Sequence, residues 1–239
     1  MDETAFDAWR VGAFAGYSTT RFNVDARNSS GTSDNYHIGA YAGTNWGSLA
    51  LRSGFAYAWH DLKTTRHVAF PGFADTLKAS YDAGTAQAFG ELAYGFRQAS
   101  VALEPFANLA YVSLRTDGLT ETGGAAAQHS ANSVVDATFT TLGLRASTNF
   151  LVGATSATAR GSLGWRHAFG DTLPAATLAF AGSGPFAITG VPIAQDAAVL
   201  DLGLDFNLTR NAVLGIAYGG QFGSGVTDQT VRANFSARF

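Results

Sequence analysis

The last nine residues of the chain alternate between apolar and polar side chains up to the C-terminal residue. Val231, Ala233, Phe235, Ala237 and Phe239 share one face, and Arg232, Asn234, Ser236 and Arg238 share the other. A period of two predicts a β-strand. Chain ends usually fray, whereas this strand carries an apolar stripe that ends on an aromatic residue. A soluble protein rarely ends in this way.

The same alternation recurs in nine earlier segments, so the sequence predicts ten strands. The apolar stripes lie within residues 9–17, 36–42, 49–59, 86–96, 101–111, 142–150, 159–165, 200–208 and 212–222. The opposite faces carry Gly, Arg, Asp and Asn, whereas a soluble sandwich favours Lys, Glu and Thr. Aromatic residues such as Trp9, Tyr17, Trp59 and Tyr94 stand at stripe ends. This pattern predicts an all-β fold, an antiparallel up-and-down barrel that is apolar outside, polar inside and girdled by aromatic residues in a membrane.

The predicted connections differ in length on the two sides of the barrel. Short connections cover residues 43–47, 97–99, 151–156 and 209–211, and long loops are predicted for 20–34, 61–80, 115–133 and 170–195. The last connection on the long side, 223–228, is short. Short periplasmic turns and longer external loops are typical of bacterial outer-membrane barrels. We therefore expect a multi-pass protein of the cell outer membrane with its C-terminus in the periplasm.

The amino-acid composition excludes several classes of protein and of site chemistry. Charged residues make up 14 % of the 239 residues, against about 25 % in typical soluble domains. With 0 cysteines, disulfides and thiolate chemistry are excluded. The net charge of -3 gives no basic footprint for nucleic acid. The N-terminus lacks the basic and apolar regions of a secretory signal. Residues 1–239 are expected to form one domain, either soluble or cut from a longer exported precursor.

Several segments in order resemble the C-terminal translocator domain of autotransporters, the type V secretion proteins of Gram-negative bacteria. They are Trp9-Arg10-Val11-Gly12, Tyr36-His37-Ile38-Gly39-Ala40-Tyr41, Gly90-Glu91-Leu92-Ala93-Tyr94, Leu103-Glu104-Pro105-Phe106, residues 120–127, Leu142-Gly143-Leu144-Arg145, Gly164-Trp165-Arg166-His167, Gly190-Val191-Pro192 and the ending from Gly220 to Phe239. The resemblance implies export of an N-terminal passenger polypeptide, with the outer-membrane lipid and the barrel assembly machinery as further partners. The family barrel has twelve strands, and a helix that lies in the pore precedes them in the sequence. The ten strands predicted here therefore suggest a chain that is truncated at its N-terminus.

Two sets of residues are candidates for function. Polar and charged side chains on the inward faces are expected to line the lumen: Arg52, Glu91, Glu104, Asn108, Arg145, Arg160, Arg166, Asp201, Asp205, Gln221, Arg232, Asn234 and Arg238. They either form a hydrated, salt-bridged wall that holds the barrel in shape or contact the pore helix and passenger. Val231, Phe235 and Phe239 either anchor the last strand at the membrane interface or act as the assembly signal that the resemblance implies.

No catalytic, metal or cofactor site is predicted. The sequence has no Gly-x-Ser-x-Gly motif, and its histidines lack the helical spacing of zinc hydrolases. The glycine-rich run 219–225 follows a strand into a turn, which excludes a dinucleotide-binding loop. Three alternatives stay open: a ten-stranded barrel protease or lipase, for which His60-Asp61 is the candidate pair, a passive porin, and a soluble sandwich.

Overall fold

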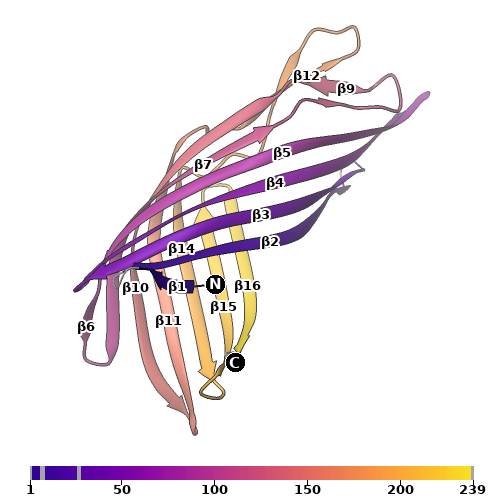
Figure 1. Cartoon of the computed structure of the whole chain (residues 1–239). Helices are drawn as coiled ribbons and strands as arrows, with labels where there is room; N and C mark the ends of the chain where they lie inside the picture. The colour runs from indigo at the N-terminus through magenta and orange to yellow at the C-terminus, as the bar shows by residue number, and fades with distance from the viewer. Residues whose placement is uncertain (1, 6–8, 26–27, 238–239) are drawn as a thin grey trace.

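A computed structural model describes residues 2–5, 9–25 and 28–237, and it is almost entirely β-structure. Its main sheet has 12 strands, and the ten long ones are antiparallel neighbours in chain order (Figure 1). The long strands are β2 (Trp9–Val24), β3 (Ser29–Trp46), β4 (Leu49–Phe70), β5 (Phe73–Tyr94), β7 (Val101–Thr116), β10 (Ser133–Val152), β11 (Thr155–Gly170), β14 (Asp196–Asn207), β15 (Ala212–Gly223) and β16 (Val226–Ala237). The short strands β1 (Asp2–Ala5) and β6 (Phe96–Gln98) pair with β2 and β7.

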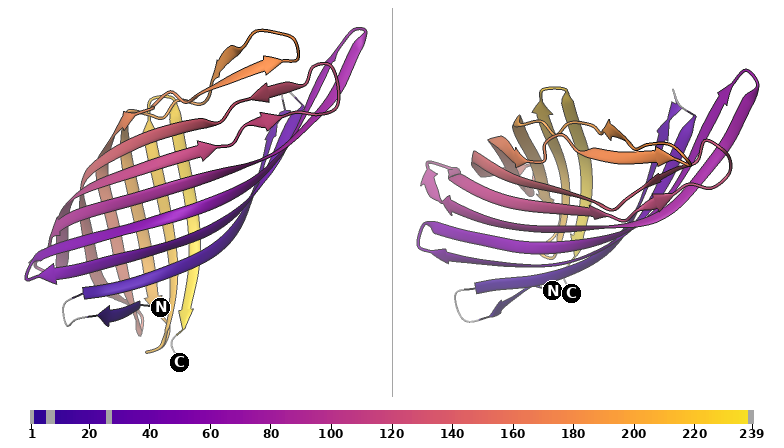
Figure 2. Two further views of the ribbon diagram at one scale, coloured as in Figure 1. Left: turned by 45° about the horizontal axis from the view of Figure 1, so that its top comes forward. Right: turned by 90° about the horizontal axis from the view of Figure 1, so that it is seen from above.

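This arrangement confirms the predicted all-β, up-and-down fold. The sheet curls into a trough, which is clearest when it is seen from above (Figure 2). Within the described residues no ladder joins β16 to β1 or β2, so the two edges of the sheet stay open. The same part of the chain contains no helix with the length and apolar character needed to cross a membrane.

The strands keep their faces because their ladders run without interruption. Residues 9–24 pair with 44–29 one for one, and the pairing of β3 with β4 and of β4 with β5 is equally regular. The apolar stripes therefore stay on one face along each strand, and their large side chains remain uncovered: Phe55 and Leu163 are each 61 % exposed. An apolar surface of this extent suits contact with lipid rather than with water.

The connections at one end of the sheet are short turns, as predicted. Gly47 and Gly153 occupy two of them with φ of 60° and 62°, a backbone conformation that glycine adopts without steric cost. We call this the short-turn end. The other end, where the hairpins extend furthest, is the long-hairpin end.

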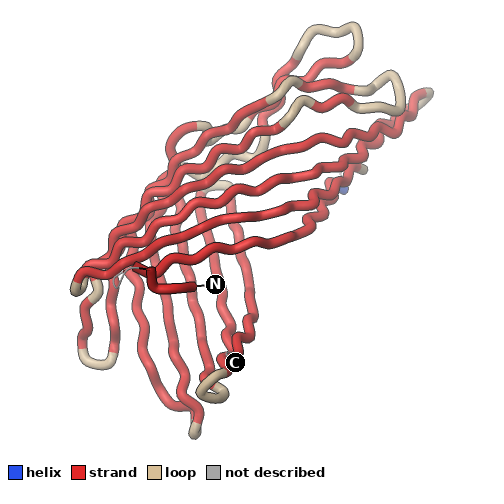
Figure 3. Tube along the Cα trace, viewed as in Figure 1, coloured by secondary structure: helices blue, strands red, loops and turns tan. Residues whose placement is uncertain are grey.

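Two of the long loops predicted from the sequence are instead strands. Residues 20–24 and 29–34 continue the hairpin β2–β3, and residues 61–70 and 73–80 continue the hairpin β4–β5, because cross-strand pairing persists through polar residues such as Asp61 and Asp82. Polar alternation hid these extensions, since the prediction relied on apolar stripes. The extended strands dominate the long-hairpin end (Figure 3).

The other two predicted loops contain a second sheet of four short strands in the order β13-β12-β9-β8. These are β8 (Leu119–Thr120), β9 (Gln128–Ser130), β12 (Ala175–Phe180) and β13 (Phe186–Thr189). The segment after β8 is tied to the β4–β5 hairpin: Arg66 Nε donates to Glu121 Oε1 at 3.0 Å, and the Ala126 amide donates to Asp75. Leu77 is fully buried close by. The long-hairpin end is thus a folded extension of the sheet.

Candidate functional site

Four charged residues from four strands meet on the polar face of the sheet. The register sets Arg52 of β4 opposite Glu91 of β5, and Glu104 of β7 opposite Arg145 of β10. Because these strands alternate without a bulge, all four side chains share the face opposite to the apolar stripe. We call this set the charge cluster.

The charge cluster is completely cross-connected. Arg52 donates to Glu91 at 2.9 Å and to both Glu104 oxygens at 2.9 and 2.7 Å. Arg145 donates to both Glu91 oxygens at 2.8 and 2.6 Å and to Glu104 at 3.0 Å. Glu91 is only 7 % exposed, so its charge depends on these two guanidinium groups. Two positive and two negative charges leave the charge cluster neutral.

An inward-facing aromatic ring supports Arg145. Its guanidinium carbon lies 3.9 Å from the centroid of the Phe106 ring, within cation–π range. The same ring lies over Gly143, where a Cβ would come within 2.6 Å of Phe106 Cζ. Phe106 is not among the lumen residues predicted from the sequence, because the pattern of alternation places apolar side chains on the outer face. Gly143, on the strand next to that of Phe106, is the sequence signal that could have indicated an inward-facing aromatic ring there.

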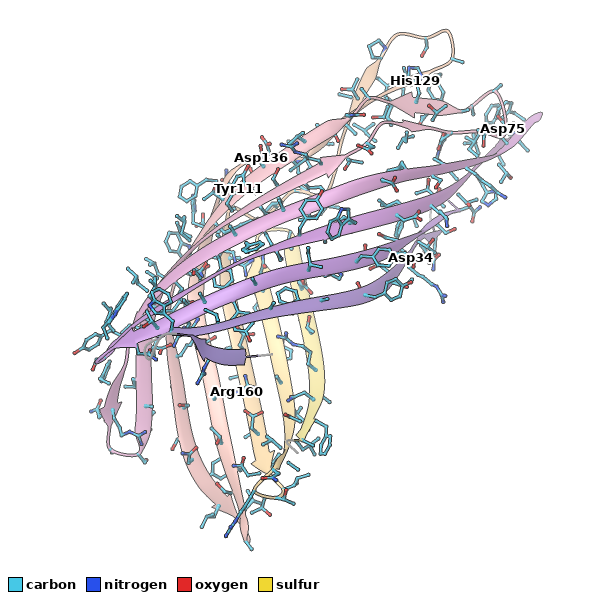
Figure 4. All side chains as sticks on the ribbon, viewed as in Figure 1. Asp34, Asp75, Tyr111, His129, Asp136 and Arg160 are labelled. Carbon is cyan, nitrogen blue, oxygen red and sulfur yellow. The ribbon has the colours of Figure 1, made fainter. Side chains whose placement is uncertain are left out.

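Other predicted lumen residues form smaller groups on β11, β14, β15 and β16. Arg160 Nε donates to Asp205 at 2.8 Å, and Arg166 donates to Gln221 at 2.8 Å (Arg160 is labelled in Figure 4). Arg232 lies 4.0 Å from Asp201, with both side chains largely exposed. Such exposed pairs contribute little to stability.

The remaining predicted residues are not brought into these groups. Asn108 stands opposite Glu91, and Asn234 stands opposite Gly215. Arg238 and Phe239 lie outside the described residues. Val231 and Phe235 are strongly exposed on β16, the last strand of the main sheet.

A polar cluster toward the long-hairpin end was not foreseen. The two ring nitrogens of His60 lie 2.7 Å from Asn35 Oδ1 and 2.8 Å from Thr85 Oγ1, and Asn35 is buried. His60 and Asp61 lie within β4 rather than at its end, and consecutive strand residues face opposite sides. They therefore cannot act together as the predicted enzyme pair.

On the outer face, aromatic residues donate hydrogen bonds to carboxylates of neighbouring strands. Tyr17 donates to Asp34 at 2.7 Å, and Tyr111 donates to Asp136 at 2.9 Å (Tyr111 and Asp136 are labelled in Figure 4). Trp165 donates to Asp196 at 2.9 Å, and His167 Nδ1 lies 2.8 Å from the same carboxylate oxygen. In the part of the chain that is described, no group of three or more His, Cys, Asp or Glu side chains could hold a metal ion.

The curled sheet with an apolar outer face and a charged inner face defines a membrane β-barrel domain. The family model for the autotransporter beta-domain matches residues 1–219. The chain therefore belongs to the autotransporter beta-domain family, whose domains are outer-membrane barrels.

Relatives and solved structures agree with this assignment. Two curated proteins of Serratia marcescens, each named "Extracellular serine protease", are 39 % identical over 240 residues. The match covers 100 % of this chain and 23 % of each relative, so the chain spans about a quarter of their length.

Among solved structures, the translocator domain of autotransporter NalP from Neisseria meningitidis has a TM-score of 0.78 at 13 % identity, covering 100 % of this chain and 77 % of that one. The beta domain of the Bordetella autotransporter BrkA has a TM-score of 0.66 at 19 % identity, covering 100 % and 86 %. At these identities the likeness concerns the fold.

Proposed function

We propose that this domain inserts into the outer membrane and gives an N-terminal passenger a route to the cell surface by type V secretion. The observation that carries the proposal is the division of the sheet into a lipid-compatible face and a charged face. Barrel closure would satisfy every backbone group internally, as a membrane requires. A polar wall with its charges already paired lets a polypeptide pass without binding tightly.

The proposal includes an orientation. The short turns and the C-terminal end of β16 face the periplasm, and the long hairpins face outward, in line with the general asymmetry of such barrels. The serine protease activity in the relatives' names belongs to those whole proteins. We assign any passenger activity to sequence outside the region matched here.

We further propose that Val231, Phe235 and Phe239 present β16 to the barrel assembly machinery. A strand at the edge of a sheet is a template for pairing with another strand, and β16 stands at such an edge. The predicted lumen residues, from Arg52 to Arg238, serve in this proposal as the wall of the pore.

The experiment is a reporter fusion. A signal peptide and an epitope-tagged reporter precede the complete translocator region, and external protease is added to intact cells. The proposal predicts that the added protease cleaves the reporter on cells that carry the parent protein. It also predicts that deletion of Phe239 removes the barrel from the outer membrane. A barrel that reaches the membrane while the reporter stays protected would favour the porin alternative instead.

A further inference from the structure

Three rows of outward-facing side chains cross β2, β3 and β4 toward the long-hairpin end. The first row is Tyr17, Tyr36 and Trp59, the second is Thr19, Asp34 and Asp61, and the third is Arg21, Thr32 and Lys63. Within each row the residues are direct cross-strand partners. Because successive rows are two residues apart on unbroken ladders, all three rows face the same side.

The first row marks the outer boundary of the apolar surface. Tyr17, Tyr36 and Trp59 are 60 %, 54 % and 47 % exposed, and such aromatic residues sit at membrane interfaces. The third row is four residues further on, about 13 Å along the strand and roughly 9 Å above the aromatic row at a tilt of about 45°. The headgroup layer of a leaflet is about 5–7 Å thick, so flexible cationic side chains of the third row reach it.

The cations of the third row are available for a partner. Among the described residues, neither Arg21 nor Lys63 forms an ion pair within 4 Å, although both are exposed. The nearest carboxylate, Asp34, accepts hydrogen bonds from Tyr17 at 2.7 Å and from Thr19 at 2.9 Å, and its charge attracts Lys63 and Arg21 only at a distance longer than an ion pair.

The register brings the two cations to one place. Thr32 is the direct partner of both Arg21 and Lys63, so the two cationic residues flank it on the strands to either side, about 10 Å apart at Cα. Arginine offers a planar fork for two phosphate oxygens, lysine a mobile point charge, and threonine a hydroxyl donor. Asp34 and Asp61 repel an anion nearer the membrane, which favours a phosphate at the third row alone.

We propose that Arg21, Thr32 and Lys63 bind the phosphate of a phosphorylated lipid headgroup in the outer leaflet. The inference rests on the orientation proposed above, in which the long hairpins face outward. It does not require passenger export, because lipid binding is measured on the purified protein.

The test counts bound lipid by native mass spectrometry on the complete translocator region in detergent. Bisphosphorylated lipid A is the probe, and dephosphorylated lipid A and inorganic phosphate are the comparison ligands. We expect the double variant Arg21→Ala/Lys63→Ala to bind bisphosphorylated lipid A at least about tenfold more weakly than the parent protein. A matched control, Arg97→Ala/Arg210→Ala, removes two cations at the short-turn end and should leave binding unchanged.

Three results would overturn the proposal: equal lipid A binding by the double variant and the parent, equal binding of the dephosphorylated lipid, or displacement by millimolar inorganic phosphate, which would assign the site to the free ion. Heat-modifiable gel mobility reports folding of each variant. If the double alanine variant does not fold, Arg21→Gln/Lys63→Gln keeps the side-chain length without the charge and must show the same loss.

Discussion

Arg145 Nη2 lies 2.6 Å from Glu91 Oε2 although their strands, β10 and β5, are separated by β7. Side chains on the inner face of a curled sheet converge, which lets this pair span an intervening strand. The contact therefore depends on curvature as well as register. It links the charge cluster to the shape of the trough.

Arg145→Ala should lower the free energy of unfolding by about 2–3 kcal/mol, because buried Glu91 would keep only Arg52 as a cationic partner. Urea unfolding in detergent micelles measures the change. Adding Glu91→Gln to Arg145→Ala should cost less than the sum of the single changes, since the two residues interact directly. If the changes in the free energy of unfolding were strictly additive, the Glu91–Arg145 interaction would contribute nothing to stability.

Leu202 and Asp201 test which face meets lipid. Leu202 is 50 % exposed on the apolar face, and an arginine there would cost about 2–4 kcal/mol at the membrane midplane. Leu202→Arg should reduce assembled barrel in outer-membrane fractions, whereas Asp201→Asn should leave it at the parent level. Equal heat-modifiable mobility of both variants on unheated gels would contradict the assignment of faces.

Alanine substitutions at two strand glycines of the inner face distinguish the effect of a steric clash from the effect of a change in backbone freedom. A Cβ at Gly143 would meet Phe106 Cζ at 2.6 Å and the Leu163 carbonyl oxygen at 2.7 Å, whereas a Cβ at Gly16 would meet nothing within 4 Å. Gly143→Ala should destabilise by about 1–3 kcal/mol, and Gly16→Ala should not destabilise. Thermal unfolding of both variants in the same detergent provides the comparison.

Asp34 lies just beyond the aromatic row, outside the apolar band. The hydrogen bonds from Tyr17 and then Thr19 lower the pKa of Asp34 below its ordinary value of 3.8. Because the pKa of Asp34 is lower in the folded state, ionised Asp34 stabilises the fold at pH values above its pKa in the unfolded state. This stabilisation is lost as the pH falls through the pKa of the folded state. Tyr17→Phe should raise the pKa of Asp34 in a carbon-13 NMR titration. Tyr36→Phe is the control, and an unchanged pKa in Tyr17→Phe would refute the role of that hydroxyl.

Much of the fold could be predicted from the sequence, because apolar alternation marks strands wherever one face meets lipid. The ten stripes correspond to the ten long strands. The extensions of β3 and β4 to Ser29 and Phe70 could not be predicted in this way, since beyond the apolar band both faces are polar and the period of two no longer separates residue types.

The candidate site was predictable to a similar degree. Opposite charges on inward faces indicated Arg52, Glu91, Glu104 and Arg145, but only register and curvature determine that these four meet. The inward orientation of Phe106 was not predicted, because hydropathy does not distinguish an aromatic ring that faces inward over a glycine from one that faces outward. Asn35 and His60 stand just beyond the ends of two apolar stripes, and no sequence pattern indicates the register that makes them direct partners.

The proposed orientation is tested most directly by site-specific labelling, because the chain contains 0 cysteines. Gly72→Cys at the tip of the β4–β5 hairpin and Gly153→Cys in a short turn are treated separately in intact cells with a membrane-impermeant maleimide. A membrane-spanning translocator with outward hairpins predicts labelling of Gly72→Cys in intact cells and of Gly153→Cys only after the outer membrane is permeabilised. Labelling of Gly153→Cys but not of Gly72→Cys in intact cells, or labelling of neither after permeabilisation, would contradict the account.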